Sequence, residues 1–80
     1  MTPETIRILH TEYPGHGWGF ESPDLAGFVG GVQTYEAAHR EAEEAVAFHL
    51  EDEPDRLAAL RDGRLVIVHY VPERAAGLVA

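Results

Sequence analysis

The strongest constraint on this chain is the order of turn, strand and helix signals in its second quarter. Pro23 fixes its own φ, and Asp24 can accept hydrogen bonds from nearby backbone amides, which is typical of a turn. Gly27 suits a backbone conformation that side chains resist, and the apolar residues 28–33 indicate a short strand. Thr34 is a good N-cap for the Ala/Glu-rich segment after it. We therefore expect a turn, a strand and a capped helix in this order.

Periodicity predicts the other elements. Alternating polar and apolar residues predict a hairpin before the turn. A proline, a glycine and an aliphatic run predict a short second helix and then a strand buried on both faces. The expected elements are strands at 5–13 and 18–22, a third strand at 28–33 with a bulge or close approach at Gly30-Gly31, a main helix from Tyr35 to about Glu51, a short helix at 55–61 and a strand at 65–71.

The fold class predicted from this order is α+β, in a single domain over residues 1–80. A small antiparallel or mixed sheet in the order β-β-β-α-β would have the main helix packed on one face. One stripe of that helix carries mostly small residues, which indicates close packing on the sheet. Phe48 lies off the stripe and suggests a second apolar contact. The stripe comprises Tyr35, Ala38, Ala42, Ala45, Val46 and His49.

The chain is short, with 80 residues and no cysteine. A core of this size rarely supplies more than about 3–5 kcal/mol, and neither a disulfide nor a thiolate–zinc site can reinforce it. Association of copies is the remaining common way to bury more surface. We therefore expect a homo-oligomer.

The charge is strongly acidic, with a net charge of −8 from 14 acids and 6 basic residues. This disfavours direct DNA binding, which needs a basic surface, and suits a basic protein partner. The alternative is that the acidity serves only to keep a small protein soluble. No apolar run is long enough for a membrane span and no signal-peptide pattern is present, so we expect a cytoplasmic protein without membrane contact. The acids concentrate between residues 36 and 55, as a solvated helix face or a docking surface.

Catalytic and metal-binding patterns are weak. The five histidines match no ligand motif, and three of them lie on strand or helix stripes, which indicates partly buried structural residues; no metal or cofactor is expected. Ser22 lacks a nucleophile motif, and the glycine-rich pieces lack the Gly-Lys-Ser/Thr of a phosphate loop. Glu21 and Asp24 could form a carboxylate pair, as acids in such a chain often do by chance. The chain is therefore expected not to be an enzyme.

The ordered set of motifs resembles the HicB-like antitoxin family. The turn Pro23-Asp24-Leu25-Ala26-Gly27 is similar to the family's Pro-Asp-Leu-Pro-Gly, and Thr34-Tyr35-Glu36-Ala37-Ala38, then Ala42-Glu43-Glu44-Ala45, is similar to its helix start. The likeness covers roughly residues 5–52 and, more loosely, the final strand. Ala26 replaces the second proline, and Val32-Gln33 stands where Gly-Asp often precedes the threonine.

The resemblance implies a partial RNase H-like βββαβ unit that associates as a dimer or a tetramer. This sequence shows no ordered acidic set that could hold two metals. It implies an antitoxin that neutralises a small basic, HicA-like ribonuclease toxin by covering its catalytic histidine and RNA surface. A C-terminal DNA-binding module is not expected, because only nine residues follow Val71. The expected toxin contacts are Trp18, Phe28, Glu43, Glu44, Glu51 and Asp52, and the structural motif residues are Pro23, Asp24, Gly27 and Thr34.

Two alternatives stay open. The first is an orphan HicB-like module that binds a ligand or another protein and has no cognate toxin. The second is a weak metal-dependent nuclease of RNase H descent, in which Asp24 would be required.

Overall fold

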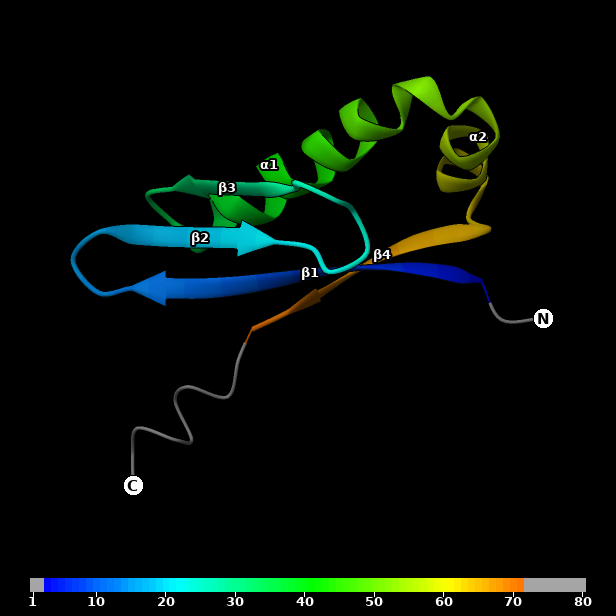
Figure 1. Cartoon of the computed structure of the whole chain (residues 1–80). Helices are drawn as coiled ribbons and strands as arrows, with labels where there is room; N and C mark the ends of the chain where they lie inside the picture. Colours follow the sequence, from blue (N-terminus) through cyan, green and yellow to red (C-terminus); the bar gives the residue numbers. More distant parts are fainter. Residues whose placement is uncertain (1–2, 72–80) are drawn as a thin grey trace.

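The computed structural model describes residues 3–71, and these form one four-stranded sheet with two helices on one side of it (Figure 1). The expectation about the residues after Val71 lies outside this range. The elements are β1 (Glu4–Tyr13), β2 (Gly17–Glu21), β3 (Val29–Val32), α1 (Tyr35–His49), a 3-10 turn η1 (Leu50–Asp52), α2 (Pro54–Asp62) and β4 (Leu65–Tyr70).

The strand order is β3-β2-β1-β4. The pairs β1–β2 and β2–β3 are antiparallel, whereas β1 and β4 are parallel, so the first and last strands lie side by side. A parallel neighbour needs a crossover, and here α1 and α2 supply it. The mixed sheet, the βββαβ order and the short second helix confirm the predicted α+β fold.

The core lies between α1 and one face of the sheet. Ile6, Ile8 and Phe20 point to this face from β1 and β2, and all three are buried. Ala38 and Ala42 of α1 are completely buried, and their small side chains let the helix approach the strands closely. The alanine stripe in the sequence therefore marks the contact between helix and sheet.

Two details differ from the sequence-based expectations, and the structure decides between the two alternatives at a third position. The α-helix ends at His49, and the last predicted turn is 3-10. β4 is an edge strand rather than one buried on both faces, so its outward Val66 and Val68 are only half-buried. Pairing across Gly30 is regular, so a close approach rather than a bulge explains this glycine: a Cβ there would overlap the Phe20 ring.

Candidate functional site

The Pro-Asp…Gly turn is held to the sheet by Asp24. Its carboxylate accepts hydrogen bonds from the Arg7 backbone N–H at 2.8 Å and from the Arg7 guanidinium at 2.8 and 3.0 Å. These contacts lower the pKa of Asp24 to about 2. Gly27 has a φ of 73°, and the Leu25 side chain, in the same turn, is buried. The turn therefore fastens the β2–β3 connection, and its aspartate is already paired.

Thr34 caps α1 as predicted. Its Oγ1 accepts a hydrogen bond from the Ala37 N–H at 3.1 Å, and Glu36 lies in the first turn, where a negative charge favours the helix dipole. The cap fixes where α1 begins and hence which of its residues face solvent.

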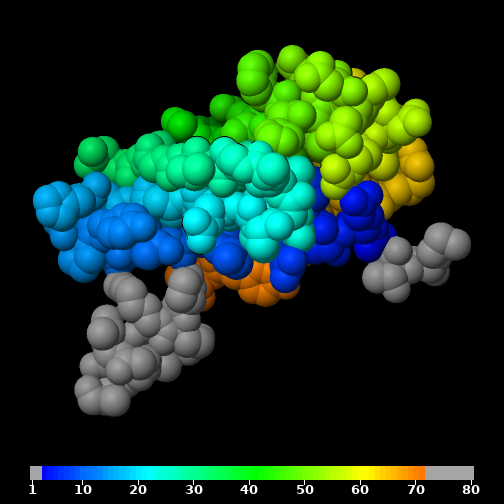
Figure 2. All heavy atoms as spheres, in the orientation of Figure 1, coloured from blue at the N-terminus to red at the C-terminus, as the bar shows by residue number. Residues whose placement is uncertain are grey.

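The acids of the predicted docking surface are exposed, and an exposed aromatic side chain lies among them in the sequence. Phe48 is 73% exposed. Glu44 lies one helical turn before it, and Glu51 and Asp52 follow three and four residues later. We call Phe48, Glu41, Glu44, Glu51 and Asp52 the Phe48 surface. The end of α1 and η1 form the upper edge of the molecule in Figure 2.

The two predicted aromatic anchors are not equivalent. Phe28 is only 7% exposed and packs in the core against Phe20, so the expectation that it anchors a partner is corrected. Trp18 is half-buried, with its ring 5.1 Å from that of Tyr35. Phe48, which the sequence marked only as off the apolar stripe, is 73% exposed, more than the exposed tyrosines Tyr13 and Tyr70.

A second group of functional side chains lies between α1 and the β1–β4 edge. His10 is fully buried, and its Nε2 lies 2.8 Å from Nδ1 of His69. Nε2 of His69 lies 2.9 Å from Oε2 of Glu43, and Nδ1 of His39 lies 3.9 Å from the same oxygen. The rings of His39 and His69 stack with centroids 3.5 Å apart. We call these four residues the histidine cluster.

The hydrogen bonds define where the protons sit. The Glu43 carboxylate only accepts, so Nε2 of His69 carries a proton, and in the neutral His69 ring Nδ1 is then the acceptor. His10 must then donate from Nε2, which leaves its Nδ1 as an unpaired buried acceptor. Burial, followed by the charges of His69 and His39, lowers the pKa of His10 to about 4. His10 is therefore neutral at pH 7.

Sequence reasoning missed the histidine cluster. His10 and His69 are 59 residues apart, and only the parallel pairing of β1 and β4 brings them together. Glu43 was expected among the toxin contacts, and in the structure its Oε2 lies 2.9 Å from Nε2 of His69. One part of the cluster could have been predicted from the sequence, because His39 and Glu43 are four residues apart and so share a helix face. His49, expected on the buried stripe, is exposed.

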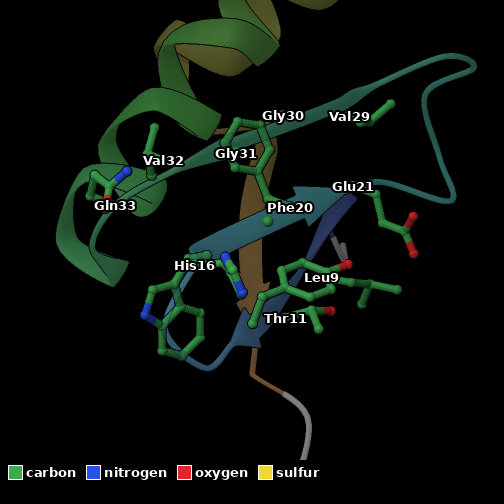
Figure 3. A pocket seen from close by; sticks show the side chains of 13 residues that line it. Leu9, Thr11, His16, Phe20, Glu21, Val29, Gly30, Gly31, Val32 and Gln33 are labelled. Atoms are coloured by element: carbon green, nitrogen blue, oxygen red, sulfur yellow. The ribbon is translucent and has the colours of Figure 1, made fainter.

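The outer sheet face carries a hollow of about 370 Å³ over β2 and β3 (Figure 3). Leu9 and Tyr13 line one side and Val29 the other. Gly31 has no side chain to fill the space between them, whereas the Tyr13 ring lies over Gly19. Within residues 3–71, no helix covers this face (Figure 1).

Comparison with protein families, curated proteins and solved structures finds no match for the chain. No helix among residues 3–71 is long and apolar enough to cross a membrane. The candidate sites therefore rest on the geometry described above.

Proposed function

We propose that this chain is a non-enzymatic antitoxin-type protein that binds and neutralises a small basic, HicA-like ribonuclease. The observation that carries the proposal is the Phe48 surface, an exposed aromatic side chain with exposed acidic residues before and after it along α1 and η1. Interface hot spots are commonly aromatic residues with a polar rim. The resemblance to HicB-like domains, in the turn at Pro23 and the helix start at Thr34, gives the partner's class.

Charge provides the mechanism of neutralisation. A ribonuclease that holds RNA phosphates needs a basic surface, and carboxylates compete for the same surface. The net charge of −8 speeds encounter with such a partner and disfavours direct DNA binding by this chain. Phe48 would add apolar contact at the centre. Because such a ribonuclease acts on cellular RNA, we propose that this chain and its toxin act in the cytoplasm.

The nuclease alternative is less well supported. Asp24, the carboxylate that it requires, accepts three hydrogen bonds from Arg7, which occupy the oxygens that a metal would need. A separate observation supports association of copies. Val66 and Val68 remain partly exposed on the sheet face that no helix of residues 3–71 covers, so a second copy could bury them.

Growth rescue with complex purification tests the proposal. The small basic protein encoded beside this gene is expressed with and without this chain. We expect toxicity alone, and relief of toxicity with a stoichiometric complex when both are present. A triple variant, Glu44→Lys with Glu51→Lys and Asp52→Lys, should lose both effects. Glu21→Lys, an exposed acid on the other side of the sheet, serves as the control.

The results also define failure. If the triple variant rescues as well as the wild type, the Phe48 surface is not the contact. If the neighbouring protein is neither toxic nor bound, the antitoxin proposal is wrong.

The alternative proposal, an orphan ligand-binding module, is favoured by one observation, the hollow over β2 and β3. Its size suits a small molecule, and Gly31 leaves the backbone open to it. A compound that raises the melting temperature in proportion to its concentration would support this alternative. The variant Gly31→Val should abolish that shift.

A further inference from the structure

We propose that His39, Glu43 and His69 bind one divalent transition-metal ion, with Zn²⁺ as the best-suited ion. Each of the three side chains offers one ligand atom, and these atoms lie within 4.8 Å of one another. Two imidazoles and one carboxylate form a ligand set typical of Zn²⁺. The inference departs from the sequence-based expectation of no metal, because the fold joins residues whose spacing suggested no site.

The backbone positions the three ligands on two elements. His39 and Glu43 are one turn apart on α1, so their side chains point the same way. His69 reaches them from β4, with a side chain only 9% exposed. His10 hydrogen-bonds the far nitrogen of His69 and fixes its ring orientation. A partner on the second nitrogen is a regular feature of metal-binding histidines.

The same geometry leaves the cluster accessible. The side chains of His39 and Glu43 are 43% and 47% exposed, so an ion and water can enter from the solvent side. The net charge of −8 raises the local concentration of cations. Three protein ligands leave one tetrahedral position for water, as in open zinc sites.

Binding requires one side chain to move. The His39 and His69 rings are stacked, 3.5 Å apart and 16° from parallel. A metal lies in the plane of each imidazole that ligates it, so two stacked rings cannot share one ion. His39 must rotate out of the stack, and its exposure leaves room for that rotation.

Binding also changes which nitrogens of the hydrogen-bonded His10–His69 pair carry protons. When Nε2 of His69 takes the metal, its proton moves to Nδ1 and is donated to Nε2 of His10. His10 then carries its proton on Nδ1, which is buried without a partner. Because this donor would be unsatisfied, we expect reversible binding that is weaker than in a closed four-ligand zinc site.

Titration calorimetry with ZnCl₂ on the full, tag-free chain tests the site, with Co²⁺ absorption reporting the geometry. We expect one Zn²⁺ per chain. His39→Ala and Glu43→Gln should each weaken binding by about tenfold or more. Matched controls lie on the same helix: His49→Ala and Glu44→Gln, both at exposed positions, should bind as the wild type does.

Absence of binding heat, or equal affinities of the wild type and His39→Ala, would overturn the inference. Circular dichroism verifies that each variant keeps its helices. This failure is separable from failure of the proposed function, since Phe48 lies about 140° around α1 from Glu43. Variants that lose Zn²⁺ should still rescue growth if the antitoxin proposal holds.

Discussion

Nε2 of His10 lies 2.8 Å from Nδ1 of His69, and this contact joins the first and last strands through two buried imidazoles. It exists because Ile8 pairs with His69 in the parallel β1–β4 register, which puts both rings on the helix side of the sheet. A buried histidine whose second nitrogen has no partner is held neutral by its surroundings. This has a direct consequence for stability at acidic pH.

Stability should fall as the pH drops from 6.5 to about 4. Burial lowers the pKa of His10 in the folded chain to about 4, from the ordinary value of 6.5. Between these values the unfolded chain binds a proton that the folded chain does not, so the free energy of unfolding decreases with decreasing pH. The full effect is on the order of 3 kcal/mol.

Urea denaturation across this pH range provides the measurement. His10→Phe keeps an aromatic ring of similar shape and removes the titrating group, so its stability should depend less on pH over the same interval. His16→Phe, at an exposed turn position, is the control, and its free energy of unfolding should change with pH as that of the wild type does. If the free energy of unfolding of His10→Phe depends on pH as strongly as that of the wild type, the prediction is wrong.

The sequence was sufficient for the fold because local signals agreed with one another. Thr34 caps the helix, the alanine stripe at Ala38 and Ala42 faces the sheet, and Gly63 ends α2 with a φ of 88°. Such signals act over a few residues and do not require knowledge of strand pairing. The parallel β1–β4 pair, in contrast, forms over the whole length of the chain.

The candidate sites were less predictable for that reason. The charged helix face was visible in the sequence, but the long-range β1–β4 register created the histidine cluster. Phe28 illustrates the opposite error. It was expected among the toxin contacts, yet its ring is buried in the core against Phe20.

Breaking the Asp24–Arg7 contact should destabilise the β2–β3 connection. Asp24→Asn removes the charge that holds the guanidinium and reduces the acceptors available to Arg7, so we expect a lower melting temperature. Asp52→Asn, an exposed acid, should leave the melting temperature unchanged. Because the pKa of Asp24 is lowered to about 2, its contribution is present above pH 3.8 and is lost as pH falls toward 2. If Asp24→Asn has the same melting temperature as Asp52→Asn, the Asp24–Arg7 contact does not stabilise the β2–β3 connection.

Phe48 should matter for binding and not for folding. Its side chain is 73% exposed, so Phe48→Ala should change the free energy of unfolding by less than about 0.5 kcal/mol. If it anchors the toxin, the same change should weaken the complex by about 2 kcal/mol. Val29→Ala, at a similarly exposed apolar residue on the other face, should leave affinity intact. Equal affinities of all three proteins would remove Phe48 from the interface.

Two adjacent glycines of β3 should respond differently to a methyl group. A Cβ on Gly30 would lie 2.7 Å from Cε1 of Phe20, whose ring is buried in the core and cannot move freely. A Cβ on Gly31 would lie 3.4 Å from the Trp18 carbonyl oxygen, which is near ordinary contact. Gly30→Ala should therefore cost about 1–3 kcal/mol, as overpacking of a core does.

Gly31→Ala serves as the internal control, because both substitutions add one methyl group to neighbouring positions of the same strand. It should change the free energy of unfolding by less than about 0.5 kcal/mol. Chemical denaturation of the two variants beside the wild type measures the difference. If Gly30→Ala and Gly31→Ala are equally stable, contact with Phe20 is not what requires glycine at position 30, because the core ring would have yielded at little cost.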